Sequence, residues 1–172
     1  MRASTPVRSL VSFLMLLGAV ACADHATPTA PHFSSAPPLS FSKGKDGKKV
    51  AVCKPQKEAW ASSQIGSKGG KVKVAGAELD VPAGALTSTV TITAHSLPTT
   101  SASVQFSPEG LHFAVPATLK LDYSKCATPL FGVTVVYVQA DTVTEVEPSQ
   151  NHAMLKYVVA RIGHFSSYAV AY

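Results

Sequence analysis

Carboxylate and imidazole side chains are the groups in this sequence that could do chemistry. Glu145 and Glu147 share a face of any strand that carries them, and glycosidases use such a carboxylate pair. No substrate-binding residues accompany them, so we expect both on a solvated strand face. Six histidines are scattered without a pair at zinc-ligand spacing, which predicts no metal site and no cofactor. They are His25, His32, His95, His112, His152 and His164.

Sequence motifs of common enzymes are missing. The chain contains no G-x-S-x-G nucleophile elbow, no H-E-x-x-H zinc motif, no P-loop and no G-x-G-x-x-G fingerprint. The sequence therefore favours a non-enzymatic protein.

The N-terminus predicts export. Arg2 and Arg8 precede the apolar run 10–20, which is too short for a spanning helix of about 20 residues. Residues 1–21 are therefore interpreted as a signal peptide.

The small residues before Cys22 resemble the lipobox of bacterial lipoproteins, which implies acylation of Cys22 and a lipid anchor on the outer side of a bacterial membrane. Ala19 stands where that motif usually has Leu, and with Ala21 it also fits A-x-A cleavage, which would give a free periplasmic or secreted protein.

Two further cysteines, Cys53 and Cys126, remain after the export signal. Exported proteins meet an oxidising environment, so this pair is predicted to form a disulfide. Zinc is a poor alternative because the two cysteines are far apart and no histidine lies at ligand spacing.

Residues 22–49 are predicted to be a disordered linker, since they are rich in Pro, Ser, Ala, Thr and then Lys, without apolar periodicity. From Lys43 to Lys73, nine lysines face two acidic residues, a local balance of +7. A polyanion such as lipid headgroups or a wall polymer is one possible partner for this segment, and a solvated spacer is the other interpretation. Beyond Lys73 the chain is mildly acidic, and we expect no nucleic-acid partner.

Residues 50–172 are predicted to form one all-β domain, a single antiparallel β-sandwich. The chain is 46% apolar and 15% charged, enough to bury a core. Val90, Ile92 and Ala94 alternate with threonines, and Leu119, Leu121 and Tyr123 alternate with Lys120 and Asp122, as in half-buried strands.

Three other segments carry structural expectations. Residues 132–139 are apolar at nearly every position, which predicts a central strand covered on both sides. Residues 153–160 predict a strand with Leu155, Tyr157 and Val159 on one side, and residues 167–172 predict a last strand. Lys57 to Gln64 is the one place where a short helix would fit.

The order of elements from about residue 65 to 172 resembles the ZU-five domain, a β-sandwich of zonula occludens scaffolds, ankyrins and netrin receptors that also occurs in bacterial surface lipoproteins. The family pattern has a Gly-Gly pair, Pro-x-Gly-Ala-Leu, a Thr-rich strand, Pro-x-Gly-Leu-x-Phe and x-Pro-x-x-Leu-x-Leu. The matching positions are Gly69, Gly70, Pro82, Gly84, Ala85, Leu86, Pro108, Gly110, Leu111, Phe113, Pro116, Leu119 and Leu121.

The resemblance implies a module for protein contacts or structure and names no partner. It also implies one piece of chemistry, because in some animal relatives the tripeptide matching His164-Phe165-Ser166 is a self-cleavage site. There the Ser hydroxyl attacks the preceding carbonyl and the His acts as base. Here only seven residues follow the bond, and they alternate as a closing strand does. We therefore expect no cleavage, with Phe165 as a buried anchor.

These observations favour a non-enzymatic lipoprotein that binds an unidentified envelope protein or a polyanion. A self-processing domain that cleaves at Phe165-Ser166 is the alternative.

Overall fold

Antiparallel strands account for almost all the regular structure of this protein. The computed structural model describes residues 47–140 and 142–172. Every strand pair in this part of the chain is antiparallel. Apart from Gly47 at the edge of the described range, the helical residues among those described form one 3-10 helix, η2 (Ala153–Leu155). The expectation of an all-β, antiparallel fold is confirmed.

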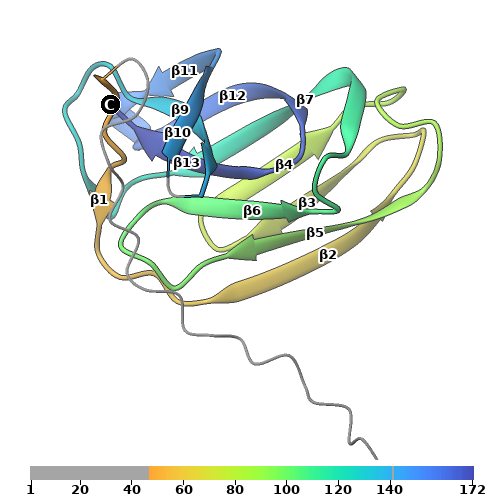
Figure 1. The fold of residues 1–172 in the computed structure, drawn as a ribbon, viewed down its shortest axis with the longest axis horizontal. Helices are drawn as coiled ribbons and strands as arrows, with labels where there is room; N and C mark the ends of the chain where they lie inside the picture. Colours follow the sequence, from red (N-terminus) through yellow and green to blue (C-terminus); the bar gives the residue numbers. More distant parts are fainter. Residues whose placement is uncertain (1–46, 141) are drawn as a thin grey trace, which may run out of the picture. The chain divides into compact units, whose positions relative to one another are not determined.

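One layer of the fold is a six-stranded sheet (Figure 1). In spatial order its strands are β10 (Thr142–Glu147), β9 (Thr134–Gln139), β13 (Ser167–Ala171), β6 (Ser103–Ser107), β5 (Val90–Ser96) and β2 (Ala59–Ile65).

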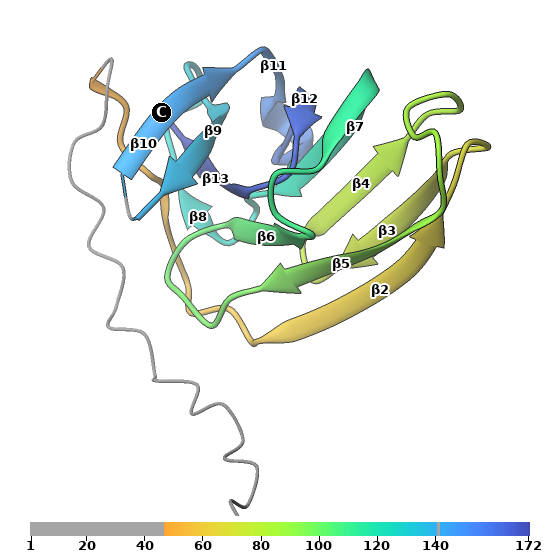
Figure 2. The ribbon, with the colours of Figure 1, turned by 45° about the vertical axis from the view of Figure 1, so that its right-hand side comes forward.

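The other layer is a five-stranded sheet, and a short two-stranded ladder lies beside the two layers (Figure 2). The five strands in order are β11 (Ser149–His152), β12 (Tyr157–His164), β7 (His112–Asp122), β4 (Ala77–Val81) and β3 (Gly70–Val74). The ladder pairs β1 (Val52–Cys53) with β8 (Cys126–Ala127).

The core lies where the inner faces of the two large sheets meet. Ile92 and Ala94 of β5 and Leu119 and Leu121 of β7 are buried, as their alternation with polar residues predicts. On β9, Val135, Val136 and Val138 are all buried, so this strand is covered on both faces as expected. Strand periodicity therefore identifies the core positions of these three strands correctly.

Two local expectations are wrong. Lys57 to Gln64 contains no helix, because residues 59–65 pair with β5 along the whole length of β2 and Trp60 stacks on His95 with ring centroids 3.4 Å apart. In the predicted strand 153–160, the first three residues form η2, and Val158 and Ala160 are the buried side rather than Leu155 and Val159. Pairing with neighbouring strands overrode the local pattern in both segments.

Position 69 requires glycine for two reasons, its backbone conformation and the lack of space for a side chain. Its φ of +76° is in the left-handed region, and a Cβ there would lie 2.4 Å from the carbonyl oxygen of Val81. The tight approach lets the turn after β2 fold against the end of β4.

The predicted disulfide between Cys53 and Cys126 is confirmed. The two cysteines are directly opposite each other in the β1–β8 ladder, and the bond closes a separation of 73 residues. It therefore holds the start of the domain to the segment that follows β7.

The two ends of the domain meet each other. Lys49 and Tyr172 exchange two backbone hydrogen bonds of 3.0 Å, and Val50 pairs with Ala171. The fold thus includes Lys49, one residue before the predicted boundary.

The last strand, β13, is expected from the sequence and lies inside the six-stranded sheet, between β9 and β6 (Figures 1 and 2). The preceding strand, β12, belongs to the other sheet. Phe165 and Ser166 are therefore the two residues with which the chain crosses from one layer to the other.

Candidate functional site

The tripeptide His164-Phe165-Ser166 forms the corner between β12 and β13, and its backbone is held on both sides. The Phe165 N–H donates to Leu111 O over 2.8 Å, Gly110 N–H donates to Phe165 O over 3.2 Å, and Phe106 N–H donates to Ser166 O over 3.0 Å. Phe165 is 1% exposed and packs against two other aromatic rings. The corner is an integral part of the core.

Self-cleavage at this corner would need the Ser166 hydroxyl activated by a base. Ser166 is buried, and no hydrogen bond joins its hydroxyl to the imidazole of His164 within the described residues. The Gly110 N–H does point at the Phe165 carbonyl, which is the group that the hydroxyl would attack. One oxyanion donor is present, whereas a preassembled base and nucleophile are not.

We expect that the purified mature protein is intact at Phe165-Ser166. Cleavage would leave β13, which pairs with both β6 and β9, held only by ladder bonds and packing. Mass spectrometry under denaturing conditions measures this directly. A fragment ending at Phe165 that disappears in Ser166→Ala would overturn the expectation.

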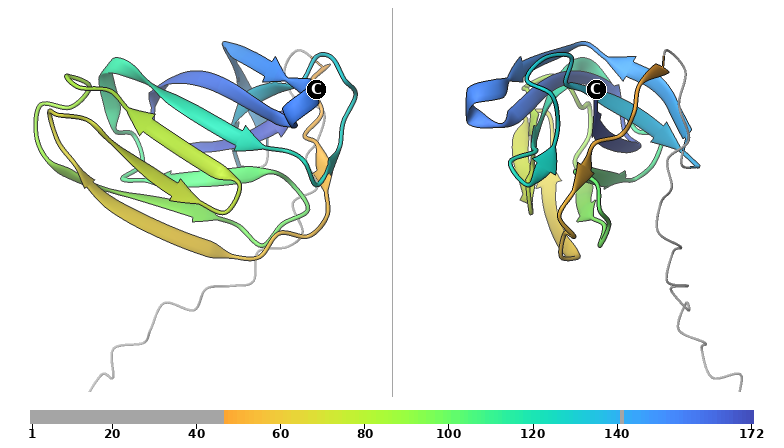
Figure 3. Two further views of the ribbon diagram at one scale, coloured as in Figure 1. Left: turned by 180° about the vertical axis from the view of Figure 1, so that it is seen from behind. Right: turned by 90° about the vertical axis from the view of Figure 1, so that its left-hand side faces the viewer.

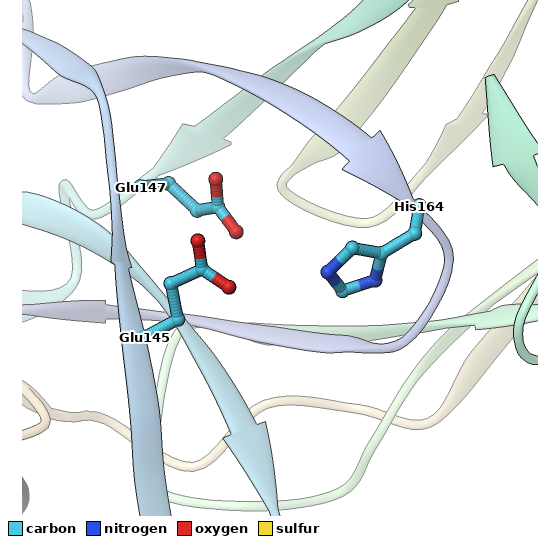
Figure 4. A group of neighbouring side chains, drawn as sticks. All are labelled: Glu145, Glu147 and His164. Atoms are coloured by element: carbon cyan, nitrogen blue, oxygen red, sulfur yellow. The ribbon is translucent and has the colours of Figure 1, made fainter. Parts of the chain in front are cut away.

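Glu145 and Glu147 of β10 and His164 of β12 converge on one point beside this corner (Figure 4). One ligand atom from each of the three side chains lies within 4.8 Å of the other two. Figure 4 shows both carboxylates directed toward the imidazole. The sequence did not associate these residues, because they come from strands of different sheets.

A register shift in β10 puts the two glutamates on the face opposite to Val143. Val143 pairs with Val138, but Glu145 pairs with Tyr137, so the ladder slips by one residue between them. Strict alternation would put Val143, Glu145 and Glu147 on one face. The bulge instead leaves Val143 in a small cluster with Val138 and places Glu145 in the row of Tyr137 and Tyr168.

The predicted solvated strand face is wrong for Glu147 and right for Glu145. Glu147 is 6% exposed, whereas Glu145 at the sheet edge is exposed. Burial, together with the charge of Glu145, raises the pKa of the Glu147 carboxyl above its usual range, and His164 opposes this shift. Burial also raises the pKa of the neighbouring Tyr168, whose hydroxyl donates to His164 O.

The other described histidines have structural surroundings. His95 stacks on Trp60 and contacts the Glu58 carboxylate at 2.9 Å. His152 stacks on Tyr157, and the ring of His112 lies 5.8 Å from that of His164.

The basic segment is partly neutralised where it enters the sheet. Lys71 and Lys73 of β3 form ion pairs with Asp80 and Glu78 of β4, at 2.6 and 3.0 Å. Their position opposite acidic residues leaves less uncompensated charge for a polyanion than the sequence balance suggests.

Four large apolar side chains are exposed on two connecting segments, whose backbone can be followed by its sequence colour in Figure 3. Leu130 and Phe131 are on the loop between β8 and β9, and Met154 and Leu155 are in η2 between β11 and β12. The Asn151 amide donates to Leu130 O over 3.0 Å and links the β8–β9 loop to β11, the strand that leads into η2. We call these four residues the apolar end.

No family model matches the chain, and no curated protein matches it either.

Within residues 47–140 and 142–172, no helix has the length and apolar character needed to cross a membrane. Cys22, the signal peptide 1–21 and most of the linker 22–49 lie outside the described residues.

Proposed function

We propose that this protein is an exported, non-enzymatic β-sandwich module, of the ZU-five type, that binds a protein partner at the cell envelope. A lipid on Cys22 would attach it to the membrane, and residues 23–46 would link the anchor to the sandwich domain. The sandwich would present the binding surface.

The observation that supports a protein partner is the apolar end. Phe131 is 83% exposed and Met154 is 93% exposed, and the Asn151 amide ties the loop that carries Phe131 to β11, the strand that precedes η2. Single exposed apolar residues are ordinary on soluble proteins, but grouped ones typically mark interaction sites. Aromatic and Met side chains are also those enriched at the centres of protein interfaces.

The double variant Phe131→Ser, Met154→Ser is expected to lose the partner. Crosslinking in native membranes followed by quantitative mass spectrometry should show a drop of about tenfold or more in the specific partner, since a few central residues carry most of the binding energy. Both side chains are exposed, so the variant should fold normally. Trp60→Ser is the matched control, because Trp60 is an exposed aromatic residue of the edge strand β2. Equal loss in both variants, or in neither, would exclude the apolar end as the binding surface.

The self-processing alternative has one supporting observation, the hydrogen bond from Gly110 N–H to the Phe165 carbonyl. The intact-mass measurement described above decides between the two functions. A polyanion partner would instead give salt-sensitive retention on an anionic resin, because screened charges lose most of their attraction at high ionic strength.

Lipidation of Cys22 is a separate expected result. Globomycin should make the precursor accumulate, and Cys22→Ser should move the protein out of the membrane fraction, because the acyl chains would be its anchor. Fractionation of wild type and variant by immunoblot measures this. A wild-type protein that is already soluble after signal removal would favour A-x-A cleavage and a free protein.

A further inference from the structure

Glu147 is a largely buried residue whose carboxylate has no hydrogen-bond or ion-pair partner among the described residues. The residue is 6% exposed, and no hydrogen bond or ion pair connects its carboxylate to another side chain or backbone group in the described part of the chain. The hydrogen bonds at this residue are accepted by its backbone oxygen, from Thr134 and Ser149. A buried carboxylate normally has compensating donors or a cation.

Groups suited to a cation surround this carboxylate. The side chains of Glu145 and His164 each bring a ligand atom to within 4.8 Å of it, and both carboxylates point at the imidazole (Figure 4). Tyr137 and Tyr168 pack around the imidazole, with ring centroids 5.2 and 6.3 Å away, which restricts its orientation. From this arrangement we infer that Glu145, Glu147 and His164 bind a divalent transition-metal ion.

The ligand set selects the class of metal. One imidazole nitrogen with two carboxylate oxygens suits Zn²⁺, Mn²⁺ and similar ions, whereas Mg²⁺ and Ca²⁺ prefer oxygen ligands alone. Zinc bonds of about 2.0–2.2 Å place neighbouring tetrahedral ligands about 3.3 Å apart. The three ligand atoms lie within 4.8 Å of one another, so they would have to draw closer to hold the ion. Glu145 is exposed, so solvent reaches the cluster and would supply a water as the fourth ligand.

A metal ion here would connect the two layers. It would join β10, an edge strand, to the corner at the end of β12. The site is separate from the apolar end and does not depend on the proposed protein-binding function.

Metal binding can be measured on the tag-free mature chain with Co²⁺ as a spectroscopic probe and Zn²⁺ as competitor. We expect one Co²⁺ per chain, with visible absorption that Zn²⁺ abolishes and that a large excess of Mg²⁺ or Ca²⁺ leaves unchanged. Glu147→Gln and His164→Gln should each weaken binding by at least about tenfold, because each removes a direct ligand. Glu145→Gln, at an exposed position, should weaken it without disturbing the fold.

Matched controls separate this site from others on the same chain. Glu109→Gln and His152→Gln should bind as the wild type does, and so should the double variant His25→Ala, His32→Ala. Circular dichroism checks that each variant is folded. Absence of stoichiometric Co²⁺ binding, displacement by Mg²⁺ or Ca²⁺, or undiminished binding by folded Glu145→Gln and Glu147→Gln would overturn the inference.

Discussion

Replacing both Cys53 and Cys126 with alanine is expected to lower the free energy of unfolding by about 4 kcal/mol, from the loop-closure entropy of a bond that spans 73 residues. The loss is large against a domain stability of roughly 5–15 kcal/mol. The unfolded chain would gain most of the freedom, because the bond otherwise keeps the start of the domain near residue 126. Denaturant titration of the wild type and the double variant measures the difference.

A reductant provides the control for the disulfide. It should shift the midpoint of the wild type toward that of the Cys53→Ala, Cys126→Ala variant and leave the variant unchanged. A difference of less than about 1 kcal/mol would mean that residual structure already keeps these two segments close in the unfolded chain, against the entropic account.

Phe165→Ala is expected to destabilise the domain by about 3–5 kcal/mol, which is the range for removing a buried phenylalanine from a core. Its ring lies 5.2 Å from that of Phe106 in the six-stranded sheet and 4.9 Å, edge to face, from that of Phe113 in the other. The substitution would therefore leave a cavity where both layers meet at the corner.

Phe131→Ala is the matched control because it removes the same ring from an exposed loop position. Its free energy of unfolding should stay within about 0.5 kcal/mol of the wild type. Chemical denaturation of the two variants in parallel gives both values. A small loss for Phe165→Ala would show that the neighbouring rings close the cavity, and would contradict the role of Phe165 as an anchor.

The proposed protein contact and the inferred metal site use different parts of the molecule. The apolar end is formed by the β8–β9 loop and η2, whereas the metal ligands are on β10 and at the end of β12. A variant at one place should therefore leave the other measurement unchanged, since distant sites without shared partners behave additively.

The sequence alone determined the fold class and the covalent link. The alternation in β5 and β7 and the continuous apolar run in β9 correctly predicted which residues are buried. Successive side chains of a strand point to opposite faces, so apolar residues in the sequence directly mark the covered faces. The disulfide followed from counting, since the predicted export signal accounts for Cys22 and leaves Cys53 and Cys126 as one pair.

The sequence predictions were wrong in two segments, where pairing with neighbouring strands set the secondary structure. Such pairing is not encoded in the local sequence. Lys57 to Gln64 is the one place where the sequence allowed a short helix, and the pairing of Ala59–Ile65 with β5 makes a strand there instead. Residues 153–155 became a 3-10 helix because β12 pairs with β7 only from Tyr157 onward.

The Glu145, Glu147 and His164 cluster depended on the tertiary structure alone. A one-residue slip in β10 reversed the face on which the glutamates lie. The spacing of apolar residues in the sequence does not predict such a bulge. The corner at Phe165 and Ser166 then set where the histidine of one sheet meets the edge of the other. Ligands on different strands have no fixed spacing along the chain, so spacing could not reveal them, and only the packing of the two sheets brought them together.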